Sequence, residues 1–137
     1  MAETVTNRGK YLVATAGLSG LDLRMLAFTG TQTGTADPDI NTVAELDAVS
    51  GVSIHTERLA LTGEAITEDD TDNRAEADAA NPAFAAAAGV TAQGVAIYDE
   101  GNATDAGRQI LAIFTTGFPQ PMDGGLTVTI ADWLRLA

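Results

Sequence analysis

The sequence predicts a mainly β fold, a sandwich or barrel-like arrangement of antiparallel strands, with one or two short helices in the N-terminal third. From residue 52 onward, short apolar or alternating runs are separated by turn-forming residues, which is typical of all-β domains. Two runs before residue 52 instead carry helix signals, a capping residue and a closing glycine. At 137 residues the chain has the length of one domain, so we expect 1–137 to fold as a single unit.

The first helix is predicted over residues 8–16. Thr6 or Asn7 can cap its N-terminus, because short polar side chains accept hydrogen bonds from the first free amides, and Gly17 suits its C-terminal end. A strand is predicted next, over residues 21–28. Its residues first alternate between polar and apolar and then become apolar on both faces, so the strand should enter the core.

A polar loop and a second short helix follow this strand. Residues 29–39 contain turn formers and no large apolar residue, so they should form an exposed loop. Thr42 and Glu45 then fit a capping box, in which two side chains satisfy two free backbone amides at the start of a helix. Val43, Leu46 and Val49 recur at helical spacing before Gly51, so one short helix is expected there.

Five further strands are expected in the rest of the chain, at residues 58–66, 74–80, 94–98, 109–115 and 126–130. The last one alternates most clearly, with Leu126, Val128 and Ile130 facing one way. The strand at 109–115 is apolar on both faces, which predicts a central strand covered on both sides. Glycine-containing turns at 99–102 and 122–125 should reverse the chain.

An alanine-rich stretch in the middle of the chain supports two interpretations. Alanine has the highest helix propensity, yet Asn81 and Pro82 interrupt the stretch. Residues 74–80 alternate between charged residues and alanine, which favours the strand given above. The conformation of residues 83–88 stays open.

The chain is acidic and contains no cysteine. It has 19 Asp and Glu against 7 Lys and Arg, a net charge of −12, so we expect no direct nucleic-acid partner, because such binding needs a positive patch. No run approaches the ~20 apolar residues of a membrane-spanning helix, and the first ten residues do not resemble a secretory signal. We therefore expect neither membrane insertion nor signal-directed export. The absence of cysteine excludes disulfides and thiol chemistry.

The densest acidic cluster centres on Asp69, Asp70 and Asp72. Closely spaced carboxylates suit a hard cation such as calcium. An EF-hand loop starting at Asp70, however, would place Ala75 where glycine is needed. We interpret the cluster as a solvated acidic turn, with these three aspartates as the alternative ligands of a cation, and we expect no resident metal or cofactor.

The sequence contains no catalytic motif. His55 is the single histidine and lacks the neighbouring residues of hydrolase or metalloprotease signatures. Gly17 and Gly20 flank a short turn that is not followed by the Gly-Lys-Ser/Thr of a phosphate loop. We therefore expect no enzymatic activity and assign no catalytic residue. A small hydrolase that uses buried carboxylates remains an alternative, since carboxylate pairs can act as acid and base when a cleft holds them.

Phe118 and Trp133 are the aromatic residues that we single out. Phe118 precedes Pro119, and Trp133 lies near the end of the sequence, so both stand beside positions where regular structure is interrupted. Each packs on its own domain or docks on a partner, where Trp and Phe are favoured anchors. Both are candidate interface residues.

The order of these segments resembles that of small structural proteins of tailed bacteriophages, and among them most of all a head decoration protein, also called a capsid cement protein. The resemblance covers most of the chain and contains no catalytic signature. It is carried by Thr-Asn-Arg-Gly-Lys at 6–10, the strand at 21–28, and the segments 41–46, 61–63, 67–74, 94–98 and 125–130.

The resemblance implies a β-rich body on the outer surface of the virion capsid, often a trimer, that stabilises the shell against the pressure of the packaged DNA. The implied partners are the major capsid protein and further copies of the chain. As a hypothesis, residues 1–10, with the basic residues Arg8 and Lys10, contact the capsid or a neighbouring subunit. The alternative is a component of the phage tail or tail fibre, with carbohydrate binding as one form of this alternative.

Overall fold

The computed structural model describes residues 3–17, 20–72, 74–130 and 133–136, which form twelve short strands and two helices. The expected mainly β, antiparallel fold with helices near the N-terminus is confirmed. The elements are β1 (Glu3–Val5), α1 (Asn7–Ala16), β2 (Leu23–Thr29), α2 (Val43–Asp47), β3 (Ser53–Ala60), β4 (Ala65–Asp69), β5 (Arg74–Asp78), β6 (Ala83–Phe84), β7 (Thr91–Ala92), β8 (Gly94–Asp99), β9 (Ile110–Phe114), β10 (Gln120–Pro121), β11 (Leu126–Thr127) and β12 (Leu134–Leu136).

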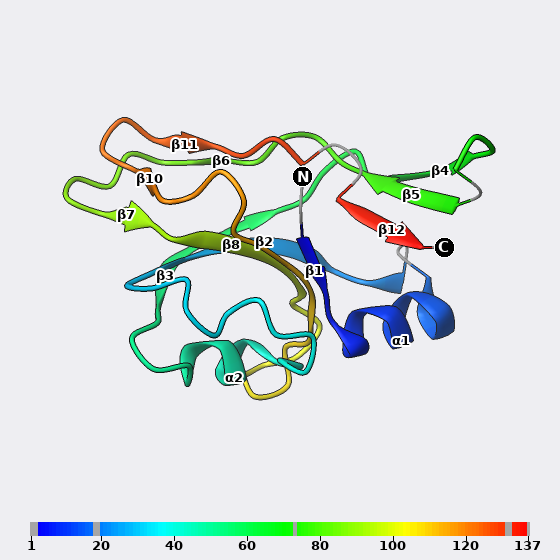
Figure 1. Cartoon of the computed structure of the whole chain (residues 1–137), viewed down its shortest axis with the longest axis horizontal. Helices are drawn as coiled ribbons and strands as arrows, with labels where there is room; N and C mark the ends of the chain where they lie inside the picture. Colours follow the sequence, from blue (N-terminus) through cyan, green and yellow to red (C-terminus); the bar gives the residue numbers. More distant parts are fainter. Residues whose placement is uncertain (1–2, 18–19, 73, 131–132, 137) are drawn as a thin grey trace.

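A five-stranded antiparallel sheet in the order β1-β9-β8-β2-β3 forms the centre of the molecule. β8 and β9 are buried at nearly every position, as the apolar run at 109–115 predicts for a central strand. One face of the sheet packs on α2 and the segment before it, in a cluster that includes Phe28, Leu46 and Tyr98. Figure 1 shows α2 on this side and the smaller strands on the other.

The opposite face of the central sheet is covered by three small antiparallel sheets, β11-β6, β10-β7 and β12-β5-β4. Between the layers lies a second apolar cluster with Met25, Ile97, Phe114, Met122 and Trp133 among its buried members. Each sheet in the described part of the chain is open and ends in edge strands, so the sheets do not close into a barrel.

The N-terminal segment is part of this framework. β1 pairs with β9, with Glu3 opposite Phe114 and Val5 opposite Ala112. The buried side chain of Thr6 then caps α1, because its Oγ accepts a hydrogen bond from the Gly9 amide at 2.8 Å and donates to the Ile110 carbonyl. Residues 1 and 2 of the predicted partner-contacting segment lie outside the described residues.

The strand predicted at 58–66 is wrong as a single element. The chain forms β3 up to Ala60, leaves the central sheet, and forms β4 from Ala65 in a different sheet. Leu61 is buried, and its amide donates to the Leu23 carbonyl at 2.9 Å. Gly63 then adopts a φ of 66°, which lets the chain turn out of the first sheet.

The strand predicted at 126–130 is shorter than expected, because only Leu126 and Thr127 pair with β6. The expected alternation nevertheless continues, since Val128 and Ile130 are buried. Their amides bond instead to the Pro82 carbonyl and the Asn81 side chain, at 2.9 and 3.1 Å. Pro82 has no amide to donate, so a regular ladder cannot continue there. Residues 83–88, left open above, start as β6 and then lack regular structure.

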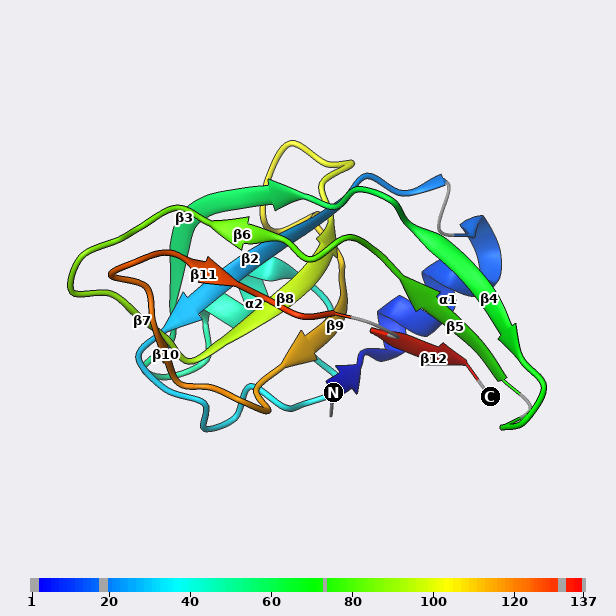
Figure 2. The same cartoon turned by 90° about the horizontal axis from the view of Figure 1, so that it is seen from above.

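β4 and β5 form a hairpin that extends from the body at the end opposite β7 and β10, as Figure 2 shows. β12 pairs with the inner strand β5, which leaves β4 at the edge of this sheet. The strand predicted at 74–80 is confirmed over the residues Arg74–Asp78, as β5. Its charged residue Glu76 is buried together with Ala77, so the charged side of the strand is not fully exposed.

Candidate functional site

The outer face of α1 carries Arg8, Lys10 and Tyr11, which we call the basic helix face. The Tyr11 side chain is 57% exposed, and the Arg8 guanidinium carbon lies 5.4 Å from the centre of its ring. The helix contains two basic and no acidic residues. Gly9 turns the other way and packs against the backbone of Leu111, so these three polar or aromatic side chains remain on the surface.

A shallow pocket of about 250 Å³ lies beside the basic helix face, lined by Asn7, Arg8, Tyr11 and Asn41. The Asn7 side-chain amide donates to the Asp39 carboxylate at 2.8 Å, and Asn41 donates to the Asp39 carbonyl at 2.9 Å. These bonds fix the long loop before α2 against the start of α1. The pocket therefore combines two amide side chains, a cation and an aromatic ring.

The acidic residues at 64–72 lie on β4 and in the turns that flank it, a segment that we call the acidic arm. Its residues are exposed except for Asp69, which is half-buried. The Asp69 carboxylate accepts hydrogen bonds from the amides of Thr71 and Asp72, at 3.0 and 3.2 Å, and so closes the turn. In the described part of the chain, no three carboxylate or imidazole side chains gather as metal ligands do. Asp70 and Asp72 are exposed.

Ile66 is the large apolar residue of the acidic arm, and it lies at the solvent-exposed end of a row of apolar side chains that runs across the small sheet. The register places Leu134, Ala77 and Ile66 side by side across β12, β5 and β4. Leu134 and Ala77 are 1% and 3% exposed, whereas Ile66 is 55% exposed. The apolar face of this small sheet thus continues past the edge of the core, where nothing in the described residues covers it.

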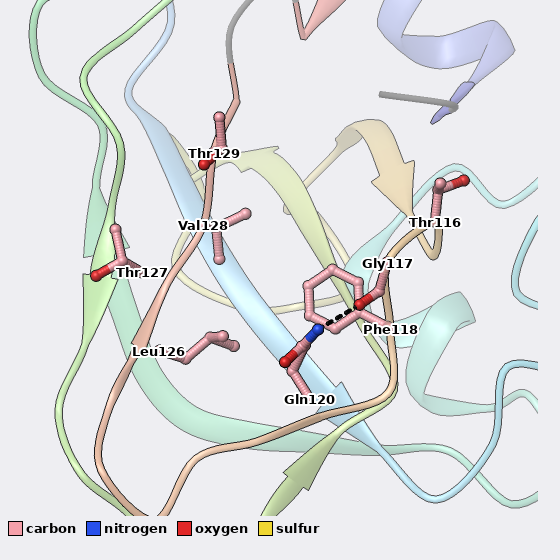
Figure 3. Close-up of a pocket in the computed structure, with 8 residues that line it drawn as sticks. All are labelled: Thr116, Gly117, Phe118, Gln120, Leu126, Thr127, Val128 and Thr129. Atoms are coloured by element: carbon pink, nitrogen blue, oxygen red, sulfur yellow. Dashed lines mark hydrogen bonds between the residues drawn. The ribbon is translucent and has the colours of Figure 1, made fainter.

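Phe118 lines a groove on the opposite side of the molecule from α2. The groove has a volume of about 240 Å³ and lies between the loop at 116–120 and the segment at 126–129. Figure 3 shows Leu126 and Val128 pointing toward the loop, and the Gln120 side-chain amide donating to the Gly117 carbonyl at 2.7 Å. Phe118 is half-buried and packs on the core cluster, so it is only partly available to a partner.

Trp133 is a core residue and not a surface residue. Its side chain is completely buried in the cluster between the two layers of the fold. The sequence left two alternatives for Trp133, packing on its own domain or docking on a partner, and the structure shows the first. We therefore correct the assignment of Trp133 as an interface residue. Its neighbour Leu134 starts β12, which places Trp133 where that strand leaves the core.

The cluster of charged side chains around Arg58 has no signal in the sequence, because Arg58 is far along the chain from the other members. The Arg58 guanidinium lies between the Tyr98 ring and Asp105, and Asp105 also accepts a hydrogen bond from Arg108 at 2.9 Å. Arg108 in turn contacts Glu100 at 2.8 Å. Four of the five residues are thus charged groups that neutralise one another in pairs, which is the arrangement of a structural ion-pair network.

His55 is half-buried on β3, and its ring meets Phe84 edge to face, with centroids 6.5 Å apart. This contact gives the single histidine a packing role beside an aromatic ring. None of the described helices is both long and apolar enough to cross a membrane.

Comparisons of the chain with protein families, with curated proteins and with solved structures give no match. The interpretation of these surfaces therefore depends on their geometry and on the resemblance noted in the sequence.

Proposed function

We propose that the protein is a virion structural protein that decorates and stabilises the outer surface of a bacteriophage capsid through protein–protein contacts. The observation that carries the proposal is the acidic arm, whose Ile66 side chain extends the apolar core face into solvent. β4 is an edge strand whose unpaired backbone groups can pair with another protein, and Ile66 adds an exposed apolar side chain to that edge. That the partner is a phage capsid is inferred from the resemblance to head decoration proteins.

The size of the molecule suits such a role. A stable interface buries about 800 Å² on each partner, which is roughly an eighth of the 6453 Å² surface of this chain. A capsid repeats the same site many times, so modest contacts can hold a complete layer of protein when each copy also contacts its neighbours. The net charge of −12 would keep the free protein dispersed before assembly.

The test is to add the purified chain to undecorated capsids of the phage that encodes it. We expect saturable binding with a fixed number of copies per capsid, together with a rise in the temperature at which the capsids release DNA. Cryo-electron microscopy would then locate the protein on the outer surface. Its absence from capsids, or its presence on the tail alone, would contradict the proposal.

Deleting residues 1–10 is not a suitable test of the contact expected there. The deletion removes β1 and the capping residue Thr6, both of which stabilise the fold. Reversing the charges of Arg8 and Lys10 changes only side chains on the surface. A loss of capsid binding in this variant would therefore report on a contact of the segment with the capsid and not on unfolding of the protein.

A second candidate function is carbohydrate binding as a tail or tail-fibre component. The observation that favours it is the pocket of Asn7, Tyr11 and Asn41, since aromatic rings and amides are the groups that contact sugars. A glycan array with the wild type and with Tyr11→Ala tests it. Signals that Tyr11→Ala abolishes would support this candidate, and an array without signals would reject it.

A further inference from the structure

We propose that the acidic arm of one copy docks on the basic helix face of a second copy. The contact would place Ile66 of the arm against the Tyr11 ring, and the carboxylates beside Ile66 against Arg8 and Lys10. The inference concerns the free chain, so it does not depend on the capsid function proposed above.

Each side of the proposed contact contains an exposed apolar side chain. Tyr11 and Ile66 are the large hydrophobic residues that stand out as exposed in the described part of the chain. Because each is more than half exposed, the two do not cover one another within one copy. Burial of both in a contact between copies would remove from water the apolar surface that the fold leaves uncovered.

The two surfaces carry opposite charges. Residues 64–72 contain five acidic residues and no basic residue, whereas α1 contains two basic residues and no acidic one. The other described arginine side chains, Arg24, Arg58 and Arg108, already form ion pairs within the chain. Among the described residues, Arg8 and Lys10 form no ion pair. Within the part of the chain whose side chains the structure describes, they are thus the cations available to an acidic partner surface.

Glu68 places a charge next to the exposed apolar side chain of the arm. It lies two residues from Ile66 on β4, so both side chains are on the same face of the sheet, and it is exposed. On α1, Lys10 and Tyr11 are likewise neighbours on the exposed side. A contact that buries Ile66 on Tyr11 therefore brings Glu68 close to the basic residues of the other copy.

The alternative of pairing two arms edge to edge is disfavoured. β4 is an edge strand, but an antiparallel pair of two β4 strands would bring acidic residues of both copies together, and like charges across a strand pair destabilise it. The arm and α1 lie at the same end of the molecule (Figures 1 and 2). Each copy thus presents both halves of the contact at one end.

Sedimentation velocity of the full chain, from about 1 to 100 µM, tests the proposal with four charge variants and with Ile66→Ser. Glu68→Lys and Lys10→Glu each reverse one side of the contact, and the variant with both substitutions restores opposite charges between copies. Asp47→Lys is the matched control, since it makes a similar acidic-to-lysine change at an exposed position of α2. Circular dichroism and thermal melting confirm that every variant is folded.

We expect the wild type and Asp47→Lys to associate equally, each single reversal to weaken association about tenfold, and the double variant to recover most of the loss. Association should also weaken at high salt, which screens complementary charges. Ile66→Ser should weaken association without lowering the melting temperature. A wild type that stays a 14.1 kDa monomer throughout, or reversals that behave like Asp47→Lys, would overturn the proposal.

Discussion

Arg58 and Asp105 form a two-pronged ion pair, with Nη1 3.3 Å from Oδ1 and Nη2 3.3 Å from Oδ2. Arg58 lies on the edge strand β3, and Asp105 lies in the loop between β8 and β9. The backbone carbonyl of Asp105 also accepts a hydrogen bond from the Ala44 amide in the first turn of α2. The pair therefore fastens one loop and one helix to the central sheet.

Asp105→Asn should lower the free energy of unfolding by about 1–2 kcal/mol, because it removes charge-assisted hydrogen bonds at a partly exposed site. Urea denaturation of the wild type and the variant measures the loss. Asp47→Asn is the control, since Asp47 is exposed and takes part in no described ion pair. Equal effects of the two substitutions would show that the ion pair does not stabilise the fold.

The contribution of Asp105 should disappear in acid. Burial disfavours ionisation of Asp105, but hydrogen bonds from Arg58 and Arg108 outweigh it and lower the pKa below the ordinary 3.8. A lowered pKa gives stability that is present above the unfolded-state pKa and is lost as the pH falls through the folded-state pKa. The difference in unfolding free energy between wild type and Asp105→Asn should stay constant down to about pH 4 and shrink below it. A difference that grows in acid would contradict the assignment.

Tyr98 should destabilise the fold in strong base. Its side chain is completely buried, and burial raises its pKa from 10.0 to about 12, aided by a hydrogen bond with Glu100 and opposed by Arg58. A raised pKa gives stability that is present below pH 10 and is lost as the pH rises toward 12. The wild type should therefore lose more stability than Tyr98→Phe over this range, as measured by urea denaturation. Parallel losses would show that Tyr98 does not titrate with unfolding.

Local signals in the sequence were sufficient for the two helices and for the central strands. Thr6 caps α1, and Thr42 and Glu45 form the capping box of α2, because both devices depend on residues three positions apart. The apolar run at 109–115 correctly indicated a covered strand. The turn of the chain at Gly63 was not predictable, since it depends on Leu61 being held by a distant strand.

The candidate surfaces were predicted in part. The acidic cluster and the exposed cation Lys10 follow from charge alone, because such side chains rarely become buried. The exposure of Ile66 could not be predicted from the sequence. Ile66, Ala77 and Leu134 are all apolar residues of predicted or short strands, and only the folded structure shows that the last two are buried and the first is exposed. The same limit applies to Arg58 and Asp105, which are 47 residues apart and meet only in the folded chain.

Gly9→Ala should destabilise the protein by about 1–3 kcal/mol, the usual cost of inserting a methyl group into a packed site. A Cβ at position 9 would lie 2.5 Å from the Leu111 carbonyl oxygen and 2.6 Å from its Cα, and these are backbone atoms of a central strand. Thermal denaturation measures the effect. Gly124→Ala is the control, because nothing lies within 4 Å of its Cβ position. An unchanged melting temperature for Gly9→Ala would show that α1 does not pack closely on β9.

Trp133→Ala should lower the free energy of unfolding by about 3–5 kcal/mol, since it empties the largest fully buried side chain of the described core. Trp133→Phe should cost clearly less, because the indole N–H has no hydrogen-bond partner in the described structure and most of the apolar volume is kept. Trp133 is the only tryptophan, so the native protein should also show blue-shifted fluorescence that acrylamide quenches poorly. If instead Trp133→Ala kept its stability and lost binding to capsids or to other copies, the residue would be an interface anchor, and its position between the two layers would be wrong.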